Sequence, residues 1–263
     1  MAMTIDEIYR VLDAYAPFSL QESYDRSGLL VGDRQKSVSR ILLTLDITIP
    51  VIREAAEKRA DLIISHHPVI WDPIRSIDST HPVWHLVQHQ IGAICSHTCM
   101  DIAEGGLNDY IGSMMAEMLP FAQQPQPFAE LSGGRTLGRT VTLEKAYSAA
   151  ELAGALREVF RSVSLRYYSG QNADNIRKIA WCSGSGGDLI ADAVRIGADA
   201  LITGDCKHSV WADAQNRAFT LFDCGHFETE VPVVNLFADI LRPACAGIEL
   251  VVSEQGTKPF FQV

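Results

Sequence analysis

The sequence predicts an α/β fold, because short apolar runs with strand character alternate with helical patterns. A strand, a helix and a second strand are expected over 39–45, 50–59 and 61–64, and again over 178–182, 188–196 and 200–202. At 263 residues with 47% hydrophobic content, the chain is long enough for two α/β lobes with sizeable cores.

The two halves resemble each other, which suggests an internal duplication of a β-α-β-α-β unit. Segment 60–65 aligns with 198–203, and in each half a histidine downstream precedes a carboxylate by four positions. The alternative is that any two β-α-β units look alike. The matching histidine–acid pairs favour two related lobes with a metal site between them.

The boundary between the lobes is expected in segment 119–127, which is rich in proline and glutamine. The first lobe would then cover 1–125 and the second 126–230. The remaining segment, 231–263, contains a helical pattern and a short strand pattern. We expect it to pack back on the first lobe.

Composition restricts the classes of function. The net charge of −10 and the pI near 5.2 disfavour nucleic-acid binding, which needs clustered Lys and Arg. No apolar run approaches the ~20 residues that span a bilayer, and the start shows no secretory pattern but a helix capping box, Thr4 with Glu7. Six cysteines without a Cys-x-x-Cys pair predict reduced thiols and a cytoplasmic location.

His66 and His67 directly follow a predicted strand, where side chains of α/β proteins form sites. Adjacent side chains on extended backbone diverge, so the two rings suit different ions of a two-metal site better than one shared ion. The alternative is a pair of strand-end histidines bonded to the backbone.

The two histidine–acid pairs are His97 with Asp101 and His226 with Glu230. Residues four apart share a helix face, so His226 and Glu230 are candidate nitrogen and oxygen ligands. Asp101 is placed to bridge two cations. His97 is ambiguous between a ligand, a residue that orients a ligand and a proton carrier. Cys95 and Cys99 flank His97 and are expected to be small buried residues rather than thiolate ligands.

Three further polar residues follow the predicted strand 200–202: Asp205, Lys207 and His208. They occupy the place that the adjacent histidines hold in the first half. They are candidates to bind substrate or to orient ligands, and the alternative is a surface turn with an ion pair.

Two other motifs carry less weight. The loop 183–187 is rich in Gly and Ser and lies between a strand and a helix, where amides can bind phosphate, but it lacks a Walker lysine and fits a tight turn better. His81, His85 and His89 recur every four residues, which is typical of a solvated helix face.

These residues together resemble the Nif-three-like, YbgI-type dinuclear-metal family, often labelled GTP cyclohydrolase type 2 homologs. The matching segments run in family order over nearly the whole chain: 25–32, 64–68, 97–101, 105–109, 203–205 and 225–230. Departures are Arg26 where Asn is usual, Cys99-Met100 where Asn-Leu is usual, and Ser209 where a second histidine often stands.

The resemblance implies two α/β lobes, a two-metal centre between them and a ring-like homohexamer. Carried over by position, the metal ligands would be His66, His67, Asp101, His226 and Glu230. This nitrogen and oxygen ligand set suits two divalent ions such as Zn, Mn, Fe or Ni, without selecting one.

The first functional hypothesis is a metal-dependent hydrolase acting on a small molecule, with a nucleotide suggested by the family label. Two cations would activate a bound water, and His97 would carry its proton. The rival hypothesis is a noncatalytic metal-binding or regulatory scaffold whose ring serves partner proteins.

Overall fold

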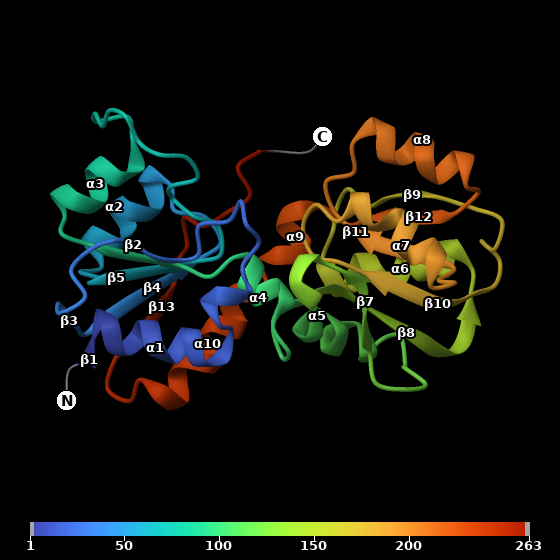
Figure 1. Ribbon diagram of the computed structural model, residues 1–263, viewed down its shortest axis with the longest axis horizontal. Coiled ribbons are helices and arrows are strands. Elements are labelled where there is room, and N and C mark those ends of the chain that lie inside the picture. The colour runs from blue at the N-terminus through green and yellow to red at the C-terminus, as the bar shows by residue number, and fades with distance from the viewer. Residues whose placement is uncertain (1–2, 261–263) are drawn as a thin grey trace. The chain divides into compact units, whose positions relative to one another are not determined.

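The computed structural model describes residues 3–260 and divides into two compact units (Figure 1). The first unit contains residues up to Glu104 together with Val233–Pro259, and the second contains Gly105–Pro232. The division at 104 lies N-terminal of the boundary expected at 125, because the helix that follows it packs in the second unit.

The first unit is built on a five-stranded sheet in the order β13-β4-β5-β6-β2. Its strands are β2 (Gly28–Val31), β4 (Arg40–Thr44), β5 (Leu62–Ser65), β6 (Gly92–Cys95) and β13 (Glu249–Val252). The first four in spatial order are parallel, and β2 is antiparallel to β6. The C-terminal strand β13 therefore completes the sheet of the first unit.

Helices cover both faces of this sheet, as Figure 1 shows for α2 and α3 on one face and α1 and α10 on the other. They are α1 (Ile5–Tyr15), α2 (Ile49–Glu57), α3 (Pro82–Gln88) and α10 (Val233–Ala244). Leu42 and Ile63 pack against Ile52 of α2. The expected capping box of Thr4 and Glu7 begins α1 and is confirmed. Small elements complete the unit: β1 (Met3–Thr4) paired with β3 (Ser37–Val38), the 3-10 turn Phe18–Leu20, and α4 (Thr98–Ile102).

The second unit is built on a six-stranded sheet in the order β7-β8-β10-β11-β12-β9. Its strands are β7 (Gln126–Glu130), β8 (Thr136–Tyr147), β9 (Arg166–Tyr168), β10 (Ile176–Trp181), β11 (Ala200–Thr203) and β12 (Thr220–Asp223). The central strands β10, β11 and β12 are parallel, and β9 is antiparallel to β12. Both sheets thus contain three neighbouring parallel strands followed by an antiparallel one.

Five helices and two 3-10 turns belong to this unit: α5 (Leu107–Ala116), α6 (Ala149–Phe160), α7 (Ile190–Arg195), α8 (His208–Asn216) and α9 (His226–Glu230), with turns Ser132–Gly134 and Gly187–Leu189. Helices α7 and α8 contribute Ile190 and Ala214 to a core with Leu201. A Cβ at Gly112 of α5 would lie 2.9 Å from the Trp181 ring, so this helix packs closely on β10.

The α/β prediction is confirmed, and the expected strands and helices correspond to β4, α2 and β5 and to β10, α7 and β11. The proline-rich segment 119–127 is not only a connection, because its last residues begin β7 and Leu119 is buried. Among the described residues, no helix combines the length and apolarity that crossing a bilayer requires.

Candidate metal centre

Three histidines of the first unit meet where β5 and β6 end. His66 and His67 follow β5, and His97 follows β6, so parallel pairing brings them to the same edge of the sheet. The candidate ligand atoms of the three rings all lie within 4.8 Å of one another. His66 is buried, while the other two rings are partly exposed. We call these residues the histidine cluster.

A hydrogen bond at Nδ1 fixes each ring of the histidine cluster. His66 Nδ1 donates to the Ser96 carbonyl at 3.0 Å, His67 Nδ1 to Asp46 at 2.7 Å and His97 Nδ1 to Asp25 at 2.9 Å. The partners only accept hydrogen bonds, so each neutral ring carries its proton on Nδ1 and its lone pair on Nε2. This is the tautomer and orientation that metal-binding histidines use.

Asp25 anchors His97 from a buried position. Its carboxylate also accepts hydrogen bonds from the Thr98 hydroxyl at 2.6 Å, the Thr98 amide at 3.0 Å and the Ser27 hydroxyl at 2.9 Å. Burial alone raises the pKa of Asp25, but the hydrogen bond and charge of His97, with the Thr98 hydroxyl and the Arg26 amide, hold that pKa well below its ordinary value. Asp25 is therefore a fixed negative charge behind His97.

Asp101 lies on α4, and its Oδ2 is 3.7 Å from His66 Nε2. Both atoms are acceptors when His66 has its proton on Nδ1 and Asp101 is ionised. Two acceptors facing each other at this distance are stabilised by a cation. The chemistry of the three clustered imidazoles, with the Asp101 carboxylate facing His66, therefore fits a divalent ion.

The corresponding strand ends of the second unit hold a smaller group. His226 begins α9, just after β12, and its Nε2 lies 2.8 Å from Glu230 Oε2. His226 Nδ1 lies 3.4 Å from Asp205 Oδ2, in the loop after β11. Glu230 is buried, and Asp205 is largely exposed. One imidazole thus lies between two carboxylates.

The Gly-rich loop after β10 contacts this group directly. A Cβ built on Gly184 would lie 1.9 Å from Glu230 Oε1 and 3.5 Å from His226 Nε2, and the φ of Gly184 is +59°. Only glycine fits both the close approach and the left-handed backbone. Loop 183–187 therefore positions Glu230 in the second unit.

Asp223 organises the turn that holds Asp205 and His226. This buried carboxylate accepts the amides of Asp205 and Gly225 at 3.0 Å each and that of Cys206 at 3.1 Å, and it pairs with Arg166. It therefore fixes the backbone on both sides of the candidate site.

The other candidates lie apart from these contacts. Lys207 is at the N-cap position of α8 without a side-chain capping hydrogen bond, His208 is the first residue of the helix, and both are exposed. Of the histidine stripe, His81 is the N-cap residue of α3 and accepts the Val83 amide through Nδ1.

The cysteines beside His97 are buried, and burial raises the pKa of Cys95 well above its usual value and that of Cys99 to about 11, which favours thiols over thiolate ligands.

Four residues of these sites have no role predicted from the sequence: Asp25, Asp46, Asp223 and Trp71. Asp46 follows the predicted strand 39–45, and Asp223 is the last residue of β12, so an acidic residue at the end of a strand was the available signal. The Trp71 ring centroid lies 5.2 Å from that of His97 and 6.5 Å from that of His67. No local pattern marks this tryptophan.

The comparisons with known proteins agree with this architecture. The family model for Duf34/NIF3 (NGG1p interacting factor 3) matches residues 3–259. The chain belongs to the Duf34/NIF3 family. A relative named GTP cyclohydrolase 1 type 2 homolog, from Clostridium perfringens, is 32% identical over 98% of this chain and 99% of its own length.

Solved structures of similar proteins share the fold of this Duf34/NIF3 member. A hypothetical protein of Staphylococcus aureus superposes with a TM-score of 0.86 at 26% identity, covering 100% of both chains. Reduced HcgD from Methanocaldococcus jannaschii gives a TM-score of 0.82 at 26% identity, covering 97% of this chain and 99% of its own. The family recognised from the sequence motifs is thereby confirmed.

Proposed function

We propose that this protein binds two divalent metal ions and is a metal-dependent hydrolase of a nucleotide or related small molecule. The proposed ligands are His66, His67, Asp101, His226 and Glu230. The observation that carries the proposal is the histidine cluster, in which all three Nδ1 atoms are bonded to acceptors and the lone pairs are left on Nε2. The expectation that both donor groups serve one dinuclear centre stays a prediction.

The bound ions would supply the Lewis acidity that makes water a nucleophile at neutral pH and polarises the substrate. The protein's own contribution is proton transfer and orientation. His97 is the proposed proton carrier: Nε2 accepts a proton from the attacking water, and Asp25 stabilises the resulting imidazolium through Nδ1. Asp46 holds His67 in the orientation that a ligand needs.

We also propose that the two units arose by duplication. The support is a shared arrangement of strands: β4, β5 and β6 are parallel with β2 antiparallel beside them, and β10, β11 and β12 are parallel with β9 antiparallel beside them. In each unit a histidine–acid pair follows the last of these parallel strands, at α4 after β6 and at α9 after β12. The homohexamer and the cytoplasmic location remain predictions from the family resemblance and the six cysteines, all of which are free and buried.

The second candidate is a noncatalytic metal-binding scaffold that forms a ring-shaped oligomer. The description of the family as an interacting factor supports it. Such a protein would bind the same ions with the same ligands, but it would release no product.

The test is a screen of metal-loaded protein against nucleotides and phosphoesters, with bound metal quantified in every sample. We expect turnover of at least one substrate, and a loss of about 100-fold or more in His66→Ala, since even residues behind the ligands cost 10–100-fold. The matched control is His89→Ala, which removes an exposed histidine of the same chain. Equal and negligible turnover by all three proteins, with metal bound in the wild type, would contradict the hydrolase and favour the scaffold.

A further inference from the structure

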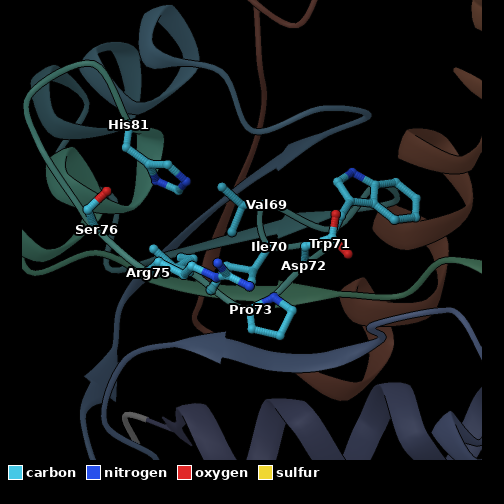
Figure 2. A pocket seen from close by; sticks show the side chains of 9 residues that line it. Val69, Ile70, Trp71, Asp72, Pro73, Arg75, Ser76 and His81 are labelled. Carbon is cyan, nitrogen blue, oxygen red and sulfur yellow. The ribbon is translucent and has the colours of Figure 1, made fainter.

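The segment between β5 and α3 forms a pocket of about 370 Å³ (Figure 2). This volume lies within the range of small-molecule sites. The pocket is lined by residues of one continuous segment: Val69, Ile70, Trp71, Asp72, Pro73, Ile74, Arg75, Ser76 and His81. Neither the proposed ligands nor the proposed proton carrier line it.

Hydrogen-bond donors are prominent in this pocket. His81 Nδ1 accepts the Val83 amide at 3.2 Å, so the neutral ring carries its proton on Nε2 and presents a donor there. Arg75 is exposed and always charged, and its guanidinium forms no ion pair with another residue in the range 3–260. Ser76 adds a hydroxyl. Arginine with neutral donors is the combination that binds an oxyanion.

One acidic residue also lines the pocket, but it lies toward the other end. Figure 2 shows Asp72 beside Trp71, whereas Arg75, Ser76 and His81 lie on the opposite side of Val69 and Ile70. The pocket is therefore polarised, with a cationic donor end and an aromatic end.

Trp71 connects the pocket with the histidine cluster. Its ring meets His97 nearly perpendicularly, at 87° with 5.2 Å between centroids, and 45% of the residue is exposed. Burial of an exposed indole against a planar ring is favourable. A ligand whose ring contacts Trp71 would lie beside the histidine cluster while its other end reaches Arg75.

We propose that this pocket binds the anionic end, a phosphate or a carboxylate, of a small molecule whose ring contacts Trp71. The inference deepens the proposed function, because it names the class of substrate for the same site. Arg75, Ser76 and His81 would bind the oxyanion, and Trp71 would select for the ring.

The test is calorimetric titration of metal-free protein, so that its result does not depend on hydrolysis or on bound ions. The probes are phenylphosphonate (ring with phosphonate), benzoate (ring with carboxylate), benzyl alcohol (ring alone) and inorganic phosphate (anion alone). We expect phenylphosphonate or benzoate to bind at least 10-fold more tightly than benzyl alcohol. The tighter of the two identifies phosphate or carboxylate as the preferred anion.

Three variants and one control variant test which residues bind the probes. Arg75→Gln should weaken binding of the preferred anion at least 10-fold, whereas Arg53→Gln removes an exposed charge on α2 and should not. His81→Asn keeps a good N-cap residue but removes the Nε2 donor, and it should weaken binding severalfold. Trp71→Leu should weaken the binding of phenylphosphonate and benzoate but leave the binding of inorganic phosphate unchanged.

Two outcomes would overturn the inference. The first is that neither phenylphosphonate nor benzoate binds more tightly than benzyl alcohol. The second is that Arg75→Gln and Arg53→Gln bind the preferred anion equally well. The proposed function is tested separately, because its metal content and turnover are measured on metal-loaded protein, whereas the pocket is tested on metal-free protein. If the protein binds phenylphosphonate but hydrolyses no ester, the proposed anion pocket stands and only the proposed hydrolase activity is contradicted.

Discussion

The two histidine–acid pairs have the same spacing but different geometry. On α9, His226 and Glu230 contact each other at 2.8 Å. On α4, His97 turns to Asp25 at 2.9 Å instead, and Asp101 faces His66 at 3.7 Å. The same four-residue spacing therefore yields a self-contained pair in one unit and two separate contacts in the other.

The difference arises at the start of each helix. His226 is the first residue of α9, so it and Glu230 lie one turn apart on the same face. His97 is the N-cap residue of α4, with φ −100° and ψ −110°, and its side chain leaves the helix face. Spacing predicts a shared face only when both residues are inside the helix. The first unit consequently gathers imidazoles, and the second gathers carboxylates around one imidazole.

The largest expected effect comes from Gly184→Ala, which targets the α9 pair alone. The new methyl group would displace Glu230, and alanine would have to adopt a positive φ. Strain and overpacking together should cost about 2–4 kcal/mol of stability. Metal bound through His226 and Glu230 should be lost, as measured by metal content after dialysis.

Gly154→Ala is the matched control for this substitution. It lies within α6, and nothing lies within 4 Å of the added Cβ, so it should stabilise the protein by about 0.4–1 kcal/mol. Equal metal content in the two variants would show that contact with loop 183–187 is not needed to position Glu230.

The next effect concerns the carboxylates behind the histidine cluster. Asp25→Asn and Asp46→Asn each remove the charge that fixes one Nδ1–H. Asp46→Asn lies behind the proposed ligand His67 and should weaken metal binding by about 10–100-fold, whereas Asp25→Asn lies behind the proposed proton carrier and should lower turnover while metal stays bound. Competition with a chelator measures the affinity, and Asp33→Asn, an exposed change, serves as the control. Unchanged metal affinity in Asp46→Asn would mean that His67 does not bind metal through Nε2.

The third effect is on stability alone and concerns how the first unit holds its C-terminal strand. Glu54 accepts hydrogen bonds from Lys58 at 2.7 Å, the Ser253 hydroxyl at 2.5 Å and the Glu254 amide at 2.8 Å. Burial raises the pKa of Glu54, but these bonds outweigh it and lower the pKa from 4.5 to about 2. The charged group therefore stabilises the fold above pH 4.5, and its contribution is lost as the pH falls toward 2.

Glu54→Gln should therefore cost about 1–3 kcal/mol at neutral pH, with the difference shrinking as the pH falls below 4.5. Hydrogen exchange should accelerate in β13 of the first unit and not in β9, the edge strand of the second. A loss of stability that does not depend on pH, or faster exchange in both strands, would contradict this account.

Much of the fold could be predicted because local patterns determine it. The short strand pattern expected within 231–263 corresponds to β13, and the capping box at Thr4 begins α1. The site was predictable only where residues follow strands, as His66 and His226 do. The bond of Asp25 to His97 joins residues far apart in sequence, and nothing in the neighbourhood of either residue specifies it. Likewise, α5 belongs to the second unit because of how it packs around Trp181 and Pro125, which composition near residue 125 does not reveal.

If the histidine cluster binds a metal ion, it does so through Nε2. Anomalous diffraction from crystals of metal-loaded protein, collected on both sides of the metal absorption edge, locates the ion. We expect a peak about 2.0–2.2 Å from Nε2 of His66 or His67, with Nδ1 still bonded to Ser96 or Asp46. A map in which the metal lies on the His81, His85 and His89 stripe, and none lies at the histidine cluster, would contradict it.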